Sequence, residues 1–244
     1  MKASPEAQRR LLDLQAVDTA LAQLAHRLKS LPEFAEIDTV ARELSALEDE
    51  RVRAQVAVDD LDRDISRFEK DIEQVRQRKD RDQKRLDSGG ALREIEGLQH
   101  ELATLNRRQS ELEDAELELM EQRESAESTL NEVRGRLTAA QQRRAEAERR
   151  RDEAVSDIAK EQEFKSSSRG PLAADLPADL VALYDKIRLD SGLGAALLRS
   201  GRCGGCRIEL YGADLARVKA AAADEVVRCE ECRRIMVRTA ESGL

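Results

Sequence analysis

The sequence has very few aromatic residues. It contains no tryptophan, three phenylalanines and two tyrosines in 244 residues, so aromatics make up 2% of the chain. A compact globular enzyme of this length normally buries far more aromatic surface than these residues supply. Glycine and proline are also sparse, with 12 and 4 residues. The composition therefore argues against a compact enzyme fold and favours long helices or coiled coils.

Long apolar segments are absent as well. No apolar run approaches the ~18 residues that a membrane span needs, and the N-terminal MKASPEAQRR lacks the apolar core of a secretory signal. We therefore expect a soluble, cytoplasmic protein without a membrane partner, in a compartment that keeps thiols reduced.

Charge is abundant but nearly balanced. Charged residues reach 38% and hydrophobic residues 40% of the chain, so wholesale disorder is not expected. The net charge of −8 argues against a chain built chiefly to coat nucleic acid, although it leaves a local basic patch open.

Apolar residues recur at helical spacing in three segments. The first predicts a helix up to Pro32, which cannot continue an interior helix ladder. The second carries heptads from Ile37 to Val75, and the third carries heptads from Ile95 to Ile158. The motif DSGG at 87–90 separates them and predicts a turn, since glycine accepts a positive φ without strain.

The two heptad segments predict an antiparallel hairpin with its tip near residues 87–91. If paired positions sum to 177, apolar layers such as Leu44/Val133 and Ile65/Leu112 follow, and the centre falls on the glycine turn. Pairing between chains would explain the heptads but not this turn. Four layers near the middle of the pairing are polar on one side. We interpret them as a solvated seam, with a docked first helix or a partner as the alternative. They are Phe68/Gln109, Leu61/Glu116, Ala54/Arg123 and Arg51/Ala126.

A cluster of serine, glycine and proline at 165–172 (KSSSRGPL) predicts a linker. We therefore expect a helical domain at 1–168 and a second domain at 169–244, which begins with a short helix over LPADLVALYDKIRLD. Further along, RIELY, EVVRC and RRIMVR predict short strands, and ADLARVKAAAA predicts a helical insertion. The segment GLGAALLRSGRC predicts a strand that leads into the first cysteine pair. The whole fold is then mostly α, with a long antiparallel coiled-coil hairpin, an additional N-terminal helix and a small C-terminal ribbon.

The four cysteines form two C-x-x-C pairs separated by 22 residues. This spacing predicts one structural Zn²⁺ bound by four thiolates, Cys203, Cys206, Cys229 and Cys232. A reducing compartment disfavours disulfides, and a thioredoxin-like redox pair would need a βαβ context that is not visible. Iron–sulfur ligation is the remaining alternative and is rarer at this spacing. The ribbon core is too small to fold alone, so metal should supply much of its folding free energy.

The pattern LLRSGRCGGCRIEL…DEVVRCEECRRIMVR after a long heptad hairpin resembles the bacterial coiled-coil plus C4-type zinc-ribbon family, its actinobacterial branch in particular. The resemblance implies that the four cysteines are the metal ligands. It also implies an adaptor or regulatory role with proposed nucleic-acid binding, and no settled enzymatic activity. Arg207 and Arg233 depart from the glycine that often follows the second cysteine of such a knuckle.

We therefore predict a non-enzymatic, zinc-binding adaptor for protein partners, with no small-molecule substrate. The chain shows no acid/base pair, nucleophile constellation or glycine-rich phosphate loop. The alternative is binding of DNA or RNA by the ribbon or by the basic hairpin tip; an unrecognised enzyme is the third hypothesis. Once the metal site is included, the ribbon is only weakly basic. The tip residues predicted to contact a phosphate or an acidic partner are Arg76, Arg78, Lys79, Arg81, Lys84, Arg85 and Arg93.

Overall fold

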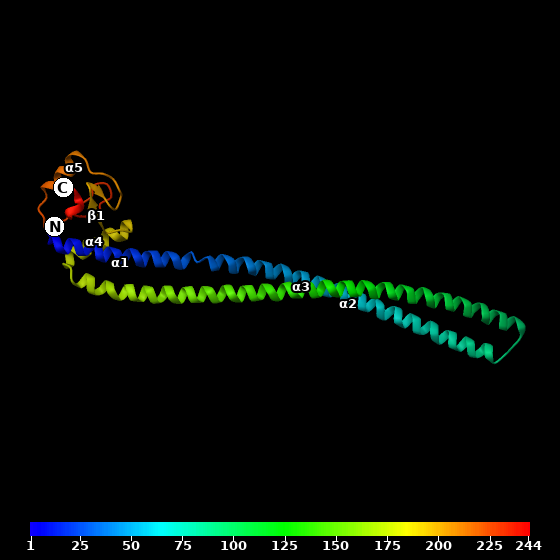
Figure 1. Cartoon of the computed structure of the whole chain (residues 1–244). Helices are drawn as coiled ribbons and strands as arrows, with labels where there is room; N and C mark the ends of the chain where they lie inside the picture. Colours follow the sequence, from blue (N-terminus) through cyan, green and yellow to red (C-terminus); the bar gives the residue numbers. More distant parts are fainter. The chain divides into compact units, whose positions relative to one another are not determined.

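The computed structural model describes residues 1–244 and is dominated by helices (Figure 1). Its five helices are α1 (Pro5–Lys29), α2 (Pro32–Asp87), α3 (Leu92–Ala174), α4 (Ala178–Ser191) and α5 (Gly212–Ala220). Its strands are β1 (Ala195–Arg199), β2 (Arg202–Cys203), β3 (Val227–Arg228) and β4 (Ile235–Val237), followed by a 3-10 turn at Ala240–Ser242. The predicted fold class, a helical hairpin with an N-terminal helix and a small cysteine-containing strand region, is confirmed.

The residues form two compact units. Residues 35–148 make the hairpin unit, and residues 1–34 together with 149–244 make the terminal unit. The grouping differs from the predicted division after residue 168, where no helix ends. That division stays a prediction.

The hairpin turn lies where the sequence predicts it. α2 ends at Asp87 and α3 begins at Leu92, and between them Gly89 adopts φ +77°, a value that an L side chain rarely takes. The Ser88 and Gly89 N–H groups donate to the carbonyls of Lys84 and Leu86 and so close the last turn of α2.

The pairing of α2 with α3 differs from the predicted register by one heptad. Ion pairs join Arg143 to Glu43 at 2.6 Å and Arg136 to Glu50 at 3.0 Å. All four residues directly precede an a position of the heptad, and their numbers sum to 186 in each pair. In the predicted register the core layers sum to 177, and the residues that precede the a positions would face each other with a sum of 179. Glu43 would then face Arg136, seven residues from its actual partner. The predicted layers are therefore wrong.

The asymmetric tip explains this shift. The predicted register assumed pairing that is symmetric about the glycines, but Leu92 at the start of α3 is 75% exposed and the first buried residue of that helix is Leu98. The first turn of α3 therefore adds residues without adding a core layer. In the core, Leu47 and Ala140 share a cluster with Leu137.

The predicted linker at 165–172 is also wrong, because α3 continues through it to Ala174. Pro171 lies within the last turn, where only one helix hydrogen bond depends on its missing N–H group. Leu172 and Ala173 pack against the core of the terminal unit, and Arg169 binds two carboxylates there. These tertiary contacts outweigh the local signals for a break.

The break before α2 is confirmed, since α1 ends at Lys29 and Pro32 begins the next helix. At the other end of α1, the Ser4 hydroxyl accepts a hydrogen bond from the Ala7 N–H and Pro5 occupies the first turn, which is a favourable helix start.

The four strands form one small sheet in the order β2-β1-β4-β3, with β1 parallel to β4 and the other pairs antiparallel. β1, β3, β4 and α5 confirm predicted elements. The segment RIELY is not a strand, because only Glu209 forms an isolated bridge, to Arg202. The N-terminus joins the same region, where Lys2 bridges to Glu225.

The sheet shares a core with the helices. Ala195, Ile235 and Val237 pack in one buried cluster with Leu14 of α1 and Tyr184 of α4. The ribbon therefore has a second source of folding free energy besides a metal ion, which its sequence did not reveal.

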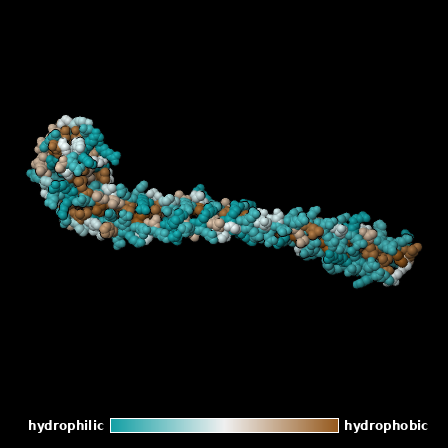
Figure 2. Space-filling view, viewed as in Figure 1, coloured by the Kyte–Doolittle hydropathy of each residue, from teal (hydrophilic) through white to brown (hydrophobic).

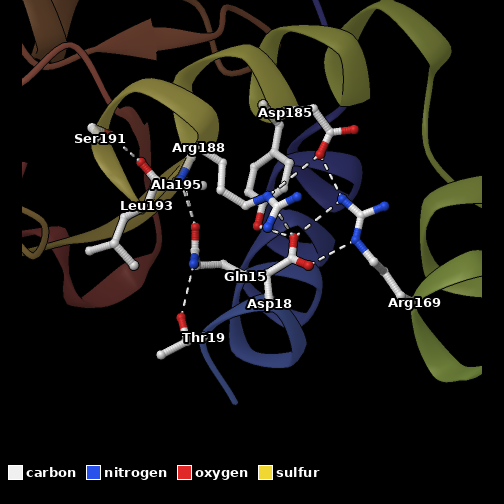
Figure 3. A network of polar contacts seen from close by, with 11 residues as sticks. Gln15, Asp18, Thr19, Arg169, Asp185, Arg188, Ser191, Leu193 and Ala195 are labelled. Carbon is white, nitrogen blue, oxygen red and sulfur yellow. Dashed lines mark hydrogen bonds and ion pairs between the residues drawn. The ribbon is translucent and has the colours of Figure 1, made fainter. Parts of the chain in front are cut away.

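A buried polar network lies within this core (Figure 3). The Asp18 side chain is only 2% exposed and accepts hydrogen bonds from Arg169 Nε at 2.8 Å and from the Tyr184 hydroxyl at 2.8 Å. Arg188 Nε lies 3.3 Å from the same carboxylate, and Asp185 binds Arg169 at 2.6 Å. Burial, and then the bond to Asp18, raise the pKa of the Tyr184 hydroxyl. The network ties α1, α3 and α4 together.

Gln15, one turn earlier on α1, extends the network to the sheet. Its Oε1 accepts hydrogen bonds from the N–H groups of Gly194 at 2.7 Å and Ala195 at 3.3 Å. Its amide nitrogen donates to the Thr19 hydroxyl at 2.9 Å.

The substitution Asp18→Asn tests how much this network contributes to the free energy of unfolding. It removes the charge that pairs Arg169 and Arg188, whose side chains are 27% and 32% exposed. We expect a loss of about 2–3 kcal/mol of unfolding free energy, less than for a fully buried pair because water reaches both arginines. Urea unfolding followed by tyrosine fluorescence measures it, because Tyr184 lies in the network.

Asp175→Asn is the matched control. Asp175 is 59% exposed and pairs with Arg10 at 3.3 Å, so its loss should change stability by less than about 1 kcal/mol. Equal effects of the two substitutions would contradict a structural role for the buried network.

Candidate metal centre

The four cysteines come together at two loops of the sheet. Cys203 ends β2 and Cys206 follows in the next turn, while Cys229 follows β3 and Cys232 precedes β4. Their four Sγ atoms lie within 4.8 Å of one another. Cys203 and Cys229 are buried, at 0% and 3% exposure, and the second cysteine of each pair is half-buried.

The two cysteine loops have the same backbone hydrogen bonds. In the first, the Arg207 N–H donates to the Cys203 carbonyl at 2.7 Å and the Cys203 N–H donates to the Ile208 carbonyl at 3.0 Å. In the second, Arg233 and Arg234 make the equivalent bonds with Cys229, at 2.9 and 3.0 Å. Each C-x-x-C segment therefore forms a tight turn that presents two sulfurs on one side.

The sulfur spacing fits a tetrahedral metal. The Sγ atoms of Cys203 and Cys232 are 3.8 Å apart, as are those of Cys206 and Cys229. Four sulfurs at the Zn–S distance of about 2.3 Å in a tetrahedron lie about 3.8 Å from one another. A disulfide would require about 2.0 Å, and all four cysteines are free thiols.

Burial disfavours the simultaneous ionisation of all four cysteine thiols unless a cation is bound between them. It raises the pKa of the Cys203 thiol and raises that of Cys229 to about 12, against N–H groups of the loops that favour the thiolates. Burial acts in the same direction on Cys232, but hydrogen bonds from the Arg234 N–H and from neighbouring thiols outweigh it and lower that pKa. A bound divalent cation supplies the charge that allows all four to ionise.

Glycine within the first loop has a steric reason. A Cβ at Gly204 would lie 2.7 Å from the Leu197 carbonyl oxygen, so the loop can approach β1 this closely only without a side chain. Glycine is therefore required at this position by the close approach of the loop to β1.

The residue after each second cysteine is strained. Arg207 has φ +62° and Arg233 has φ +60°, in the left-handed region that favours glycine. Although arginine replaces the usual glycine, both loops keep the left-handed backbone conformation that glycine would adopt. The two arginines are therefore strained.

Three of the seven basic tip residues are engaged within the hairpin. Arg76 pairs with Glu113 at 2.8 Å, and Lys79 donates to Gln109 at 2.7 Å. Arg78 pairs with Glu101 and lies 3.9 Å from the buried Asp82 carboxylate. The tip residues that are exposed and have no ion pair are Arg81, Lys84, Arg85 and Arg93.

Two features of the terminal unit were not predicted from the sequence. The side chain of Arg238 donates to backbone carbonyls between α5 and β3, with distances of 2.7 Å to Ala221 and 2.6 Å to Ala222. Ile208 and Tyr211, beside the first cysteine loop, are 47% and 69% exposed. The Arg238 bonds depend on contacts between residues distant in sequence. The exposure of Ile208 and Tyr211 was not predicted because RIELY was expected to form a strand.

Residues 14–192 match the family of CT398-like coiled coil hairpin domains, and residues 202–236 match the C4-type zinc ribbon domain. The fold and the cysteine tetrad thus define a coiled-coil hairpin protein with a C4-type zinc ribbon. The first match covers more than half of the chain, so the chain belongs to the CT398-like coiled-coil hairpin family.

Known relatives support this membership. The chain is 42% identical to the uncharacterized protein Rv2229c of Mycobacterium tuberculosis, over 98% of each protein. A solved structure from Mycobacterium smegmatis has a TM-score of 0.85 and 38% identity, covering 98% of this chain and 100% of the other. CT398 from Chlamydia trachomatis has a TM-score of 0.65 at 19% identity, covering 96% and 98%, and so shares the fold. The mycobacterial relatives confirm the actinobacterial resemblance. None of the helices combines the length and apolarity needed to cross a bilayer.

Glycine at the two strained positions should stabilise the zinc-bound protein. We expect Arg207→Gly and Arg233→Gly each to raise the unfolding free energy by about 0.5–1 kcal/mol, because glycine relieves the positive φ at some entropic cost. Thermal unfolding of the zinc-loaded chain measures the effect. Arg217→Gly, in helix α5, is the control and should destabilise by about 1 kcal/mol. Destabilisation by all three would show that the arginine side chains matter more than the strain.

Proposed function

We propose that the chain is a non-enzymatic adaptor whose zinc-bound ribbon binds a protein partner. One Zn²⁺ held by Cys203, Cys206, Cys229 and Cys232 fits the 3.8 Å sulfur spacings and the match to a C4-type zinc ribbon. Four cysteine ligands complete the preferred coordination of zinc and leave no position for a substrate or water. A structural role for the ion follows from that closed coordination.

The observation that carries the adaptor role is the exposed apolar surface beside the metal loop. We call Arg207, Ile208 and Tyr211 the ribbon loop surface. Ile208 and Tyr211 are 47% and 69% exposed, whereas Leu210 between them is buried at 8%. A tyrosine and an isoleucine held at the surface by a rigid loop are typical anchors of a protein interface.

The backbone holds this surface in place. The Ile208 carbonyl accepts from the Cys203 N–H at 3.0 Å, and the Leu210 N–H donates to Gly201 at 2.8 Å. Tyr211 hydrogen-bonds Glu209, which raises the pKa of the tyrosine. Because these bonds begin at a cysteine ligand, the metal ion would order the surface before a partner arrives, which lowers the entropic cost of binding.

The test compares captured partners of matched variants. Crosslinking pull-down from the native host, with nuclease treatment, should recover a protein with the wild-type chain and lose it with Ile208→Ser/Tyr211→Ser. The double variant should keep one zinc per chain by metal analysis. Removal of zinc by a chelator should abolish the capture as well.

Leu189→Ser is the control, because Leu189 is 81% exposed and lies on α4, an element that is not part of the ribbon loop surface. It should capture the partner as the wild type does. Capture that survives the double substitution, or that disappears with nuclease, would reject the ribbon as a protein-binding surface.

A second candidate function is nucleic-acid binding by the hairpin tip. Arg81, Lys84 and Arg85 are spaced so that they share one face of α2, and no ion pair neutralises them. Three unpaired cations on one face are suited to phosphate contacts.

For this candidate we expect the wild-type chain to bind a single-stranded RNA or duplex DNA probe with an affinity that falls steeply with salt. The variant Arg81→Gln/Lys84→Gln/Arg85→Gln should abolish this binding. The control is Arg63→Gln/Arg67→Gln/Lys70→Gln, which changes the charge equally elsewhere on α2, where Arg63 and Arg67 are paired with aspartates. Equal loss in both triple variants would indicate a response to net charge and not a site at the tip.

A further inference from the structure

A groove on the hairpin unit combines exposed apolar side chains with acidic walls. It has a volume of about 600 Å³, and its apolar residues include Leu117 and Met120, which are 59% and 50% exposed, and the half-buried Ile65. Most of the visible surface of this unit is hydrophilic and is interrupted by small hydrophobic patches (Figure 2). Two large apolar side chains exposed together on such a surface are typical of an interaction site.

The groove continues along α3. Glu124 and Glu127 line both this groove and the next one, which also contains Ser128, Asn131 and Glu132. From Leu117 to Glu132 the helix rises about 22 Å, the length of a helix of about 15 residues. We call the two together the acidic groove.

Negative charge in the acidic groove is only partly compensated. Arg123 is the single cation that lines it, and this arginine pairs with Asp62 at 2.7 Å and with Glu127 at 2.5 Å. The four other carboxylates have no ion pair. They are Glu69, Glu121, Glu124 and Glu132.

We propose that the acidic groove binds an amphipathic helix of a partner protein whose apolar face is flanked by lysine and arginine. Leu117, Met120 and Glu124 lie at helical steps of three and four, so they share one face of α3 and offer apolar contacts next to carboxylates. Methionine adapts its flexible side chain to differently shaped partners. The four unpaired carboxylates repel nucleic acid and anionic membranes. The surface lies within residues 35–148, so it is independent of the ribbon loop surface and of the function proposed for it.

The test uses the zinc-loaded full chain and a defined probe. The probe is a fluorescent leucine–lysine peptide of about 15 residues, which forms an amphipathic helix of the groove's length. Two control peptides accompany it, one with the same residues scrambled so that no apolar face forms and one with glutamate in place of lysine. Fluorescence anisotropy should show binding of the first peptide, and both controls should bind at least about tenfold more weakly.

Matched variants locate the site. Leu117→Gln/Met120→Gln should weaken binding at least about tenfold, whereas Val52→Gln/Val56→Gln, which alters two valines 47% and 49% exposed outside the groove, should leave it unchanged. Glu121→Gln/Glu124→Gln should weaken binding and flatten its salt dependence, and Asp49→Asn/Asp80→Asn should not. Circular dichroism checks that every variant keeps its helix content.

Three outcomes would overturn the proposal. Equal binding of the scrambled peptide would indicate charge attraction without a groove. Unchanged binding by both groove variants would place the peptide elsewhere. A dimer in light scattering that dissociates with Leu117→Gln/Met120→Gln would assign the groove to a second copy of the chain.

Discussion

The carboxylate of Asp18, buried among three helices, constrains the whole terminal unit. A buried charge is tolerated only when partners surround it, and its partners are supplied by α3 through Arg169 and by α4 through Arg188 and Tyr184. Apolar packing alone would allow many arrangements of these helices, whereas the directional bonds to one carboxylate allow few. Gln15, on the same helix, then fixes the start of β1.

The sheet that begins there lies between two cores. Ala195 and Ile235 pack with the helices, whereas Leu198 and Met236 on the same two strands pack with the cysteines. Strands of two to five residues cannot support either core alone. Metal binding and helix packing therefore stabilise the same strands, so the ribbon is an integral part of the terminal unit. The same support explains how Arg207 and Arg233 persist at positive φ, because strain survives where surrounding bonds over-determine the backbone.

The sequence was informative wherever the signal was local. Cysteine spacing predicted the tetrad, Pro32 predicted a helix break, and the glycines predicted the tip. It failed where the outcome depends on how the segments pack against each other. The extra turn at Leu92 shifted the hairpin register, and the contact of Arg169 with Asp18, 151 residues away, kept α3 helical through a segment rich in breakers. Periodicity identifies which residues face a partner but leaves their alignment to the geometry of the turn.

Pairing, more than composition, determines what the charged hairpin can bind. The net charge of −8 suggests a uniformly acidic molecule, yet Arg76 and Arg78 near the tip and Arg123 in the groove already have carboxylate partners. The unpaired charges are segregated along the hairpin. The cations of Arg81, Lys84 and Arg85 lie near the tip, and the carboxylates of Glu121 and Glu124 line the groove beside Met120. Exposed ion pairs contribute little to stability, so these unpaired groups cost the fold almost nothing and stay available to ligands. A phosphate-bearing partner and a basic helix would therefore be directed by charge to different parts of one hairpin.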